Sequence, residues 1–289
     1  MRVLIAGAQG QIGRALAATV PPGSEALALG RAQLDLTRPA DVARGVAEFR
    51  PDLVVNAAGY TAVDRAEAEP EAARAVNEEG ARHLAGAAAD VGARMLHLST
   101  DYVFDGRQGR PYAPGDRPNP LNAYGGSKLA GELAVLDTLG AGAVVVRTAW
   151  VYAARGRNFL HTMLRLMSER EQLTVVSDQI GTPTSAASVA RAAWALADRP
   201  DLHGIAHWTD GGVASWYDFA VAIQEEALQA GLLKRASRLL PATSEEYPTP
   251  ACRPRYSVLD CSATQTALGL VPDHWRVALR RTLRELADG

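Results

Sequence analysis

The feature that most constrains the fold lies at the start of the chain, where an apolar strand leads directly into a glycine loop. The run at 2–6 is typical of a buried parallel strand. It is followed by the spacing Gly7-x-x-Gly10-x-x-Gly13 and by a helical pattern over 14–20. This order predicts a dinucleotide-phosphate loop, because glycines let the backbone approach a pyrophosphate and the helix start offers free N–H groups. A tight strand-to-helix turn without a ligand is the alternative interpretation.

The residues that follow alternate between strand and helix patterns. Strands are predicted at 25–29, 53–56, 94–98 and 143–147, and helices at 41–49 and 69–92. This alternation predicts an α/β fold with a Rossmann-type doubly wound parallel sheet. Ligands of such sheets bind beyond the carboxyl ends of the strands, and the motifs of this half fall at such ends.

After Trp150, prolines divide the pattern into shorter pieces, which predicts a smaller mixed α/β lobe. We therefore expect a dinucleotide-binding Rossmann domain over 1–150 and a mainly substrate-binding lobe over 151–289. Two helices and two strand segments are expected in this second half, at 188–197, 216–230, 171–178 and 204–209. The two strand segments can rejoin the main sheet, so the boundary need not be a single cut.

The composition predicts a soluble, cytoplasmic protein without a nucleic acid or membrane partner. The formal net charge is −2, and no basic run interleaves with aromatic residues. No apolar stretch approaches the ~20 residues of a membrane span, and the first strand leaves no room for a signal peptide. Cys252 and Cys261 fit no zinc spacing, and no cluster of ligating side chains predicts a metal site.

A pair of residues in the middle of the chain predicts acid–base chemistry. The chain contains only two lysines, and one of them, Lys128, follows Tyr124 by four residues. On a helix, residues with this spacing share one face. A nearby cation lowers the pKa of a tyrosine from its usual value of ~10, so we expect Tyr124 to exchange a proton near neutral pH. Taken alone, the pair also fits an ordinary amphipathic helix.

Further motifs, spread over nearly the whole chain, make it resemble a known family. They are the loop at 7–13 with Gln11 and the segments 56–64, 99–106, 124–128, 147–152, 178–184, 216–218 and 247–254. On these residues the chain resembles the extended short-chain dehydrogenases/reductases and, among them, the dTDP-4-dehydrorhamnose reductases. The string at 100–106 and the Pro-Thr-Pro-Ala segment at 248–251 are specific to the narrower family. The glycine loop and the Tyr/Lys pair indicate only the superfamily.

The resemblance implies an NADPH-dependent reduction of the C4 keto group of dTDP-6-deoxy-L-lyxo-4-hexulose to dTDP-L-rhamnose. It also implies a catalytic triad in which Thr100 hydrogen-bonds the substrate carbonyl and Tyr124 donates a proton to the C4 oxygen as hydride arrives from the nicotinamide. Lys128 would hold the nicotinamide ribose and lower the pKa of Tyr124. A strand-end cap is the alternative role for Thr100.

The end of the second predicted strand bears on the choice of cofactor. NAD-binding folds usually place an acidic residue there, whereas this chain has Gly30 and Arg31. Arg31 can pair with a 2′-phosphate, which favours NADPH, with NADH as a second possible cofactor; a solvated loop arginine is the alternative. The residues expected at the cofactor are Gly7, Gln9, Gly10, Gln11, Ile12, Gly30, Arg31, Asp35, Leu36, Ala57, Ala58, Gly59, Ser99, Tyr124 and Lys128.

Substrate contacts are expected from the ends of several strands and from a late segment. The expected residues are Thr61, Val63, Thr100, Asp101, Tyr102, Tyr124, Trp150 and Arg253. Arg253 is a candidate for the substrate diphosphate, since arginine suits such oxygens. Tyr102 and Trp150 would supply aromatic walls, with core packing as the alternative, and Trp216 is expected to pack rather than to contact a ligand.

One departure from the family concerns oligomerisation. Some members dimerise through a magnesium ion held by glutamates, and Ala15 and Ala187 stand at the aligned positions here. Neither side chain can bind a cation, so we expect a monomer or a dimer that is not bridged by metal.

Two other functions fit the same superfamily. The first is a nucleotide-sugar epimerase or dehydratase; dehydratases usually carry an acidic pair after the triad Thr, and here Asp101 is followed by Tyr102. The second is a non-catalytic nucleotide-binding regulatory subunit. Relatives of that kind tend to lose parts of the triad, which is complete in this chain.

Overall fold

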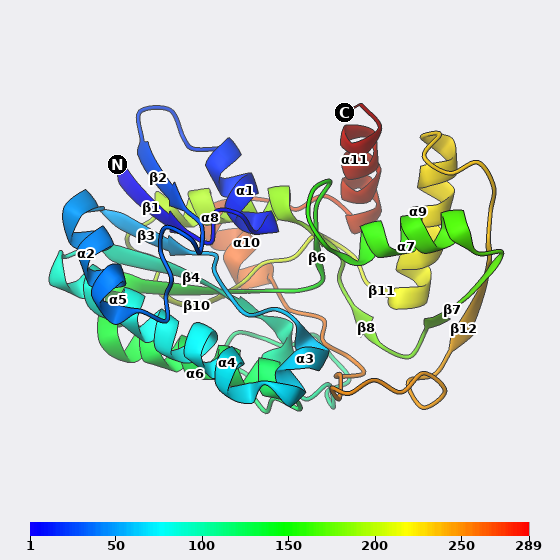
Figure 1. The fold of residues 1–289 in the computed structure, drawn as a ribbon, viewed down its shortest axis with the longest axis horizontal. Coiled ribbons are helices and arrows are strands. Elements are labelled where there is room, and N and C mark those ends of the chain that lie inside the picture. Colours follow the sequence, from blue (N-terminus) through cyan, green and yellow to red (C-terminus); the bar gives the residue numbers. More distant parts are fainter. Residues whose placement is uncertain (289) are drawn as a thin grey trace.

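The structure of the chain, a computed structural model, describes residues 1–288. Its centre is a six-stranded sheet with the order β10-β5-β4-β3-β1-β2, in which every neighbouring pair is parallel (Figure 1). The strands are β1 (Arg2–Ala6), β2 (Glu25–Leu29), β3 (Leu53–Asn56), β4 (Arg94–Thr100), β5 (Ala143–Thr148) and β10 (Gly204–His207). The predicted Rossmann-type doubly wound sheet is therefore confirmed.

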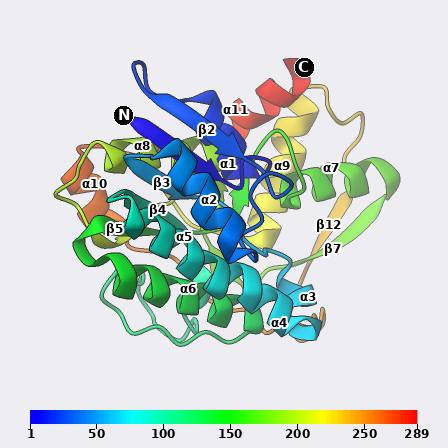
Figure 2. The ribbon, with the colours of Figure 1, turned by 60° about the vertical axis from the view of Figure 1, so that its left-hand side comes forward.

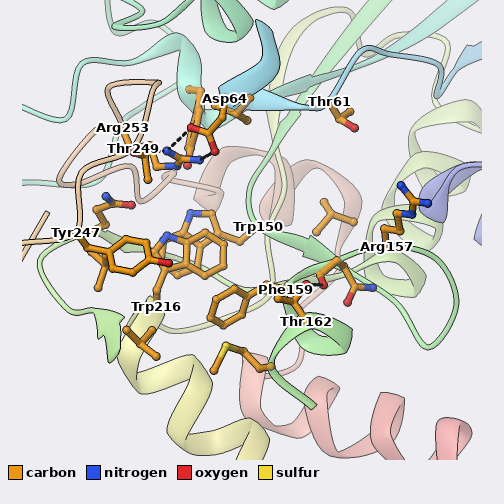
Figure 3. A pocket seen from close by; sticks show the side chains of 18 of the residues that line it. Thr61, Asp64, Trp150, Arg157, Phe159, Thr162, Trp216, Tyr247, Thr249 and Arg253 are labelled. Atoms are coloured by element: carbon orange, nitrogen blue, oxygen red, sulfur yellow. Dashed lines mark hydrogen bonds and ion pairs between the residues drawn. The ribbon is translucent and has the colours of Figure 1, made fainter. Parts of the chain in front are cut away.

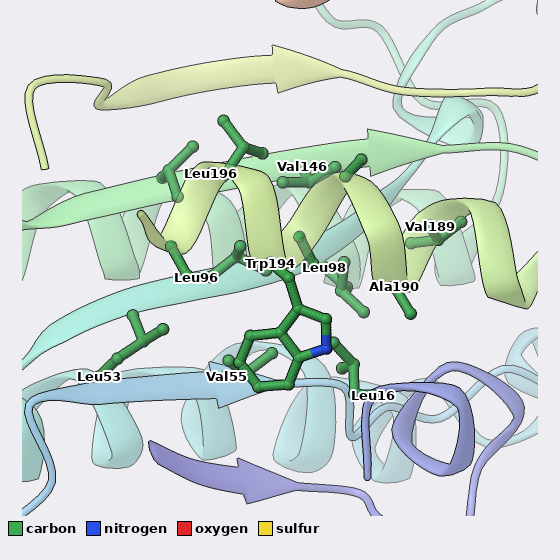
Figure 4. Close-up of a cluster of buried hydrophobic side chains, with 14 of the residues drawn as sticks. Leu16, Leu53, Val55, Leu96, Leu98, Val146, Val189, Ala190, Trp194 and Leu196 are labelled. Carbon is green, nitrogen blue, oxygen red and sulfur yellow. The ribbon is translucent and has the colours of Figure 1, made fainter. Parts of the chain in front are cut away.

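Helices cover both faces of this sheet, because the strands direct apolar side chains to both sides. The covering helices are α1 (Gln11–Ala18), α8 (Ala186–Ala197), α2 (Pro39–Phe49), α5 (Gly80–Asp90) and α6 (Ala123–Leu139). On one face α1 and α8 pack over Val3 and Val55, with Trp194 of α8 reaching across the strands (Figure 4). On the other face α2, α5 and α6 pack over Leu4 and Met95 (Figure 2).

The strand order creates a crevice at one edge of the sheet. The chain goes from β1 to β2 on one side and then returns to β3 on the other side of β1. The strand order therefore reverses at β1, and the loops that leave the neighbouring strands β1 and β3 diverge there, which leaves room for a ligand. The loops after β1, β3, β4 and β5 all emerge at this edge, so the predicted motifs are brought together by topology.

The helix predicted at 69–92 is not continuous. A short α3 (Val63–Ala68) comes first, and then α4 (Pro70–Arg74) passes through a π-helical turn at Ala75–Glu79 into α5. The turn contains Asn77, whose side chain is buried and accepts from Tyr60 N at 2.8 Å while it donates to Ser127 Oγ at 2.9 Å. Local expansion of the helix thus delivers a polar side chain to the sheet edge, which apolar periodicity does not predict.

The second half of the chain builds the smaller mixed α/β lobe, seen at the right of Figure 1. Its elements are α7 (Phe159–Glu169), α9 (Trp216–Gln229), α11 (Trp275–Asp288), β7 (Gln172–Val176) with β12 (Arg238–Ala242), and the short pairs β6 (Val151–Tyr152) with β9 (Thr184–Ser185) and β8 (Ile180–Gly181) with β11 (Ala214–Ser215). Their apolar side chains form a core of their own around Phe219 and Ile223. Within residues 1–288, no helix has the length and apolar character that a bilayer crossing requires.

The second half also contributes to the main sheet. β10 pairs with β5, and α8 and α10 (Ser262–Leu268) lie over that side of the sheet. The segment near 171–178 does not return to the main sheet, because β7 pairs with β12 instead. Its burial alternates, with Leu173 and Val175 facing the lobe core and Thr174 exposed. The inner strands β1, β3, β4 and β5 of the main sheet are instead buried on both faces, so a one-sided strand fits better on the smaller lobe.

Candidate active site

The glycine loop is shaped by close backbone contacts. Gly7 has a φ of +82°, and an added Cβ there would lie 2.5 Å from Ala58 N. A Cβ on Gly13 would lie 2.2 Å from Gly7 O. Only glycine fits at these two positions, whether or not a ligand is bound. The helix α1 begins directly after Gly10, and no side chain caps its first N–H groups, so this helix start can accept an anionic group.

Two cavities follow the crevice along the glycine loop. One, of about 250 Å³, lies between the ends of β1, β2 and β3, and includes Arg31, Asp35 and Leu36. The other, of about 470 Å³, extends from the glycine loop to Ser99 and Lys128. Every residue expected at the cofactor lines one of these cavities. Together they provide an elongated site that fits the two halves of a dinucleotide.

A further polar group in the larger of these cavities fits a bound cofactor. The Thr148 side chain at the end of β5 is buried, and within residues 1–288 its hydroxyl has no hydrogen-bond partner. A buried hydroxyl without a partner is unfavourable unless a ligand or water supplies one. Thr148 was not among the residues expected from the sequence, although it lies in the motif at 147–152, because the motif does not show which of its side chains face the cavity.

Arg31 lies at the rim of the smaller cavity. Its Nε is 3.4 Å from Asp35 Oδ2, and its side chain is 78% exposed. Asp35 is held by hydrogen bonds from the backbone and hydroxyl of Thr37, which are the main reasons that its pKa is lowered. The Arg31 guanidinium is therefore available at the end of β2, where a ribose 2′-substituent is expected.

The predicted triad is assembled from two elements. Thr100 ends β4, while Tyr124 and Lys128 stand on one face of α6. The helix can start close to the strand end because position 125 is glycine: a Cβ there would lie 2.2 Å from Tyr102 O. Thr100 and Tyr124 line both the 470 Å³ cavity and a third cavity on the side of the smaller lobe, and Lys128 lines only the former. The triad thus lies where the two cavities meet.

Burial controls the protonation of Tyr124 and Lys128. It raises the pKa of Tyr124 to about 12, against a smaller lowering by the Thr100 hydroxyl. The expected lowering of the Tyr124 pKa by Lys128 is therefore wrong for this structure, since the ammonium donates to Leu98 O at 2.6 Å instead. Burial lowers the pKa of Lys128 to about 8, and the charge of Glu132 opposes that shift. Tyr124 is consequently protonated at neutral pH, as a proton donor must be.

The third cavity, of about 740 Å³, lies between the main sheet and the smaller lobe (Figure 3). All the residues expected at the substrate line it, including Thr61, Val63 and Tyr102. The smaller lobe adds apolar and aromatic side chains that were not expected there. They include Phe159, Met163, Trp216 and Tyr247. A cavity of this size, with polar groups at one end and an apolar wall at the other, suits a small molecule with a planar or apolar part.

Two tryptophans form the centre of this wall. Trp150 and Trp216 stack with their ring centroids 3.6 Å apart and their planes 4° from parallel (Figure 3). Trp150 has a φ of +47°, a strained backbone conformation for a bulky residue, and its indole packs closely on Gly181. The Trp216 ring packs on Phe159, as expected, and it also lines the cavity, which was not predicted.

The sequence profile of the RmlD substrate binding domain family matches residues 1–288. The chain belongs to this family. It is 44% identical to the dTDP-4-dehydrorhamnose reductase of Burkholderia thailandensis, with 99% of both chains covered. It is 46% identical to the enzyme of the same name from Streptomyces griseus, over 99% of this chain and 94% of the relative.

Solved structures of the same kind superpose closely. A dTDP-4-dehydrorhamnose reductase from Clostridium acetobutylicum has a TM-score of 0.93 at 38% identity, with 99% of each chain covered. The reductase from Bacillus anthracis, solved in complex with NADP, has a TM-score of 0.93 at 36% identity, with 98% of this chain and 99% of that chain covered. A UDP-glucose 4-epimerase from Thermus thermophilus, at 22% identity and a TM-score of 0.84, shares the fold.

Within this family member, two arginines at the 740 Å³ cavity differ in their surroundings. Arg253 donates to Asp64 Oδ1 and Oδ2 at 2.9 and 2.8 Å, so its charge is already paired (Figure 3). Arg157, which was not expected, lines both this cavity and the 470 Å³ cavity, and in the described part of the chain no acidic side chain pairs with it. Its only sequence signal was a short loop rich in Gly and Arg between two family motifs. The role of Arg253 at a diphosphate stays a prediction.

The acidic residue after Thr100 is engaged by hydroxyl groups. Asp101 accepts from Thr100 Oγ1 at 3.0 Å and from Ser257 Oγ at 2.5 Å. Burial raises the pKa of Asp101 to about 7. Within residues 1–288, no group of three or more His, Cys, Asp or Glu side chains is arranged to hold a metal ion.

Proposed function

We propose that this chain reduces the C4 keto group of dTDP-6-deoxy-L-lyxo-4-hexulose to dTDP-L-rhamnose with NADPH. One observation carries the proposal: Thr100 and Tyr124 line the boundary between a dinucleotide-shaped crevice and a separate 740 Å³ cavity. A reductase needs its proton donor where the cofactor site and the substrate site meet. The named reductases that share 41–46% identity over nearly the full chain support the same substrate.

The cofactor and the three triad residues have separate roles in the proposed reduction. NADPH, when bound, supplies the hydride. The Tyr124 phenol orients and polarises the C4 carbonyl and gives its proton to the developing alkoxide. The Thr100 hydroxyl would assist by turning its O–H from Asp101 to the carbonyl oxygen. Lys128, whose ammonium donates to Leu98 O and which lines the cofactor cavity, would hold the nicotinamide ribose.

Other residues would hold the two ligands. The glycine loop and the start of α1 suit the pyrophosphate of the cofactor, and Arg31 suits its 2′-phosphate. Trp150 and Trp216 give the substrate an aromatic wall, and Arg157 offers an unpaired positive charge near both diphosphates. We also propose a cytoplasmic location, and a monomer or a dimer without a bridging metal, since Ala15 and Ala187 cannot bind one.

The alternatives have less support. A dehydratase would need a free acid beside Thr100, and Asp101 is occupied by two hydroxyl groups while Tyr102 follows it. An epimerase would recycle a tightly held NAD, whereas Arg31 at the cavity rim suits an exchangeable NADPH. A non-catalytic subunit would have no use for a triad that is both complete and placed at a cavity junction.

A spectrophotometric assay at 340 nm tests this proposal. The keto sugar is generated in situ, NADPH is added, and loss of absorbance is followed for the wild type and for Tyr124→Phe. We expect the variant to lose ~10²- to 10⁴-fold in rate, since that is the usual contribution of a positioned proton donor. Tyr256→Phe is the matched control, because this ring lies outside the three cavities. Product formation without added nicotinamide would instead support an epimerase or dehydratase.

A further inference from the structure

The face of α6 that carries the proton donor continues one turn further than the triad. Tyr124, Lys128 and Glu132 follow one another at intervals of four residues, so all three side chains lie on the same side of the helix. The proposed function uses the first two and leaves the third without a role. Glu132 is 1% exposed, and Lys128 is 5% exposed. A carboxylate buried this deeply is expensive unless it is paired, so its partners indicate what it is for.

Glu132 joins the helix to two strands at once. Its carboxylate accepts from the Ser99 hydroxyl and from Arg147 Nε and Nη2, the latter two at 2.9 and 2.6 Å. Ser99 and Arg147 are direct neighbours across β4 and β5. Each comes immediately before a residue that lines the cavity near the triad, Thr100 and Thr148 respectively. The carboxylate therefore fixes the helix that carries Tyr124 against the strand end that carries Thr100.

Glu132 also determines the charge around Lys128. The titratable or charged side chains along this face of the helix are Tyr124 and Glu132 from α6, His97 from β4, Asp101 directly after β4, and Arg147 from β5. Burial holds the pKa of His97 well below its usual value, so this ring is neutral. The charge of Asp101 raises the pKa of Tyr124. Of all these groups, Glu132 is the one whose charge favours the ammonium form of Lys128.

We propose that Glu132, held by Arg147 and Ser99, is a positioning residue that keeps Lys128 charged and aligns the Tyr124–Lys128 face of α6 with Thr100. The electrostatic part of this proposal is independent of the reaction. Its effect on turnover rests on the proposed reductase function.

The two lysines of the chain make a direct test possible. Lysine labelled with ¹³C at Cε gives two sets of NMR signals, and Lys234→Arg assigns the remaining one to Lys128. In the wild type we expect the Lys128 signal to titrate near pH 8. In Glu132→Gln the midpoint should fall by about one pH unit or more, because a neighbouring opposite charge is removed, while Lys234 stays unchanged. Glu226→Gln, which alters another buried carboxylate paired with arginines, is the matched control and should leave Lys128 unchanged.

An unchanged Lys128 midpoint in folded Glu132→Gln would overturn the electrostatic part. If that variant does not fold, Glu132→Asp takes its place. It keeps the negative charge but moves it away from Lys128 by one methylene group, so the Lys128 midpoint should fall by less. No fall at all would again contradict the proposal. Ser99→Ala tests the alignment, since it leaves the ion pair in place, and an unchanged Kd for NADPH separates this effect from the place of Ser99 on the cofactor cavity. It should lower kcat roughly tenfold with the Lys128 titration unchanged, and an unaltered kcat would refute alignment. Should the wild type show no reductase activity, the NMR result still stands on its own.

Discussion

Replacement of Arg31 by alanine should separate the two nicotinamide cofactors. The guanidinium lies at the rim of the 250 Å³ cavity, beside the carboxylate of Asp35 at 3.4 Å. NADPH would bring a 2′-phosphate to this place, and NADH only a hydroxyl. Without Arg31, the negative charge of Asp35 is left to repel the phosphate, so NADPH should lose affinity while NADH loses little.

The size of the loss in NADPH affinity follows from the exposure of the Arg31 side chain. Two unit charges ~4 Å apart attract by ~1 kcal/mol in water and by ~4 kcal/mol at an effective dielectric constant of about 20. The Arg31 side chain is 78% exposed, so the value nearer water applies. A loss of about 1–2 kcal/mol corresponds to a fall of about 5- to 30-fold in kcat/KM for NADPH. For NADH we expect less than about a twofold change.

Initial rates at 340 nm with each cofactor, at low and high salt, measure the fall in kcat/KM for NADPH relative to the fall for NADH. Arg44→Ala is the matched control, since this arginine is also exposed and pairs with Asp41 outside the cavities. Salt should reduce the effect of Arg31→Ala, because exposed charges are screened. Equal losses for NADPH and NADH would refute the reasoning.

Three further predictions follow from the site. Gly7→Ala should weaken NADPH binding, measured by fluorescence titration, and lower the free energy of unfolding by about 1–3 kcal/mol, because φ is +82° and the methyl group would meet Ala58; wild-type values for both would contradict this. Trp216→Leu should raise KM for the nucleotide sugar about 3- to 10-fold with the Kd for NADPH unchanged, since Trp216 lines the substrate-side cavity and not the two cofactor cavities; equal effects on both ligands would count against it. Finally, kcat should fall as pH rises through about 8, because Lys128, whose pKa burial lowers to that value, loses its proton; a flat profile from pH 7 to 10 would show that its charge is not needed.

Much of the main sheet follows from sequence pattern, because short apolar runs between turn residues have few other ways to be buried. The predicted strands fall on β1 to β5, and the glycine loop and triad meet at the predicted edge. The π-helical turn at Ala75–Glu79 and the pairing of β7 with β12 were not predicted. Both depend on contacts between distant segments, which periodicity does not contain.

The same distinction holds within the site. Motif residues such as Thr100 and Tyr124 were predicted from local spacing, whereas Trp216 and Arg157 reach the site only through the packing of distant elements. The direction of the Tyr124 pKa was predicted wrongly for a related reason. Spacing shows that a lysine is near, but it shows neither how deeply both groups are buried nor that the ammonium is directed to Leu98 O.

Transfer of label from cofactor to sugar tests the central claim most directly. NADPH carrying deuterium at C4 of the nicotinamide, on one face or the other, is incubated with the enzyme and the keto sugar, and the product is examined by mass spectrometry and NMR. We predict one deuterium at C4 of the sugar from one of the two labelled forms, and none from the other. Product without label from both forms, or label lost to solvent, would contradict direct reduction at the junction beside Tyr124.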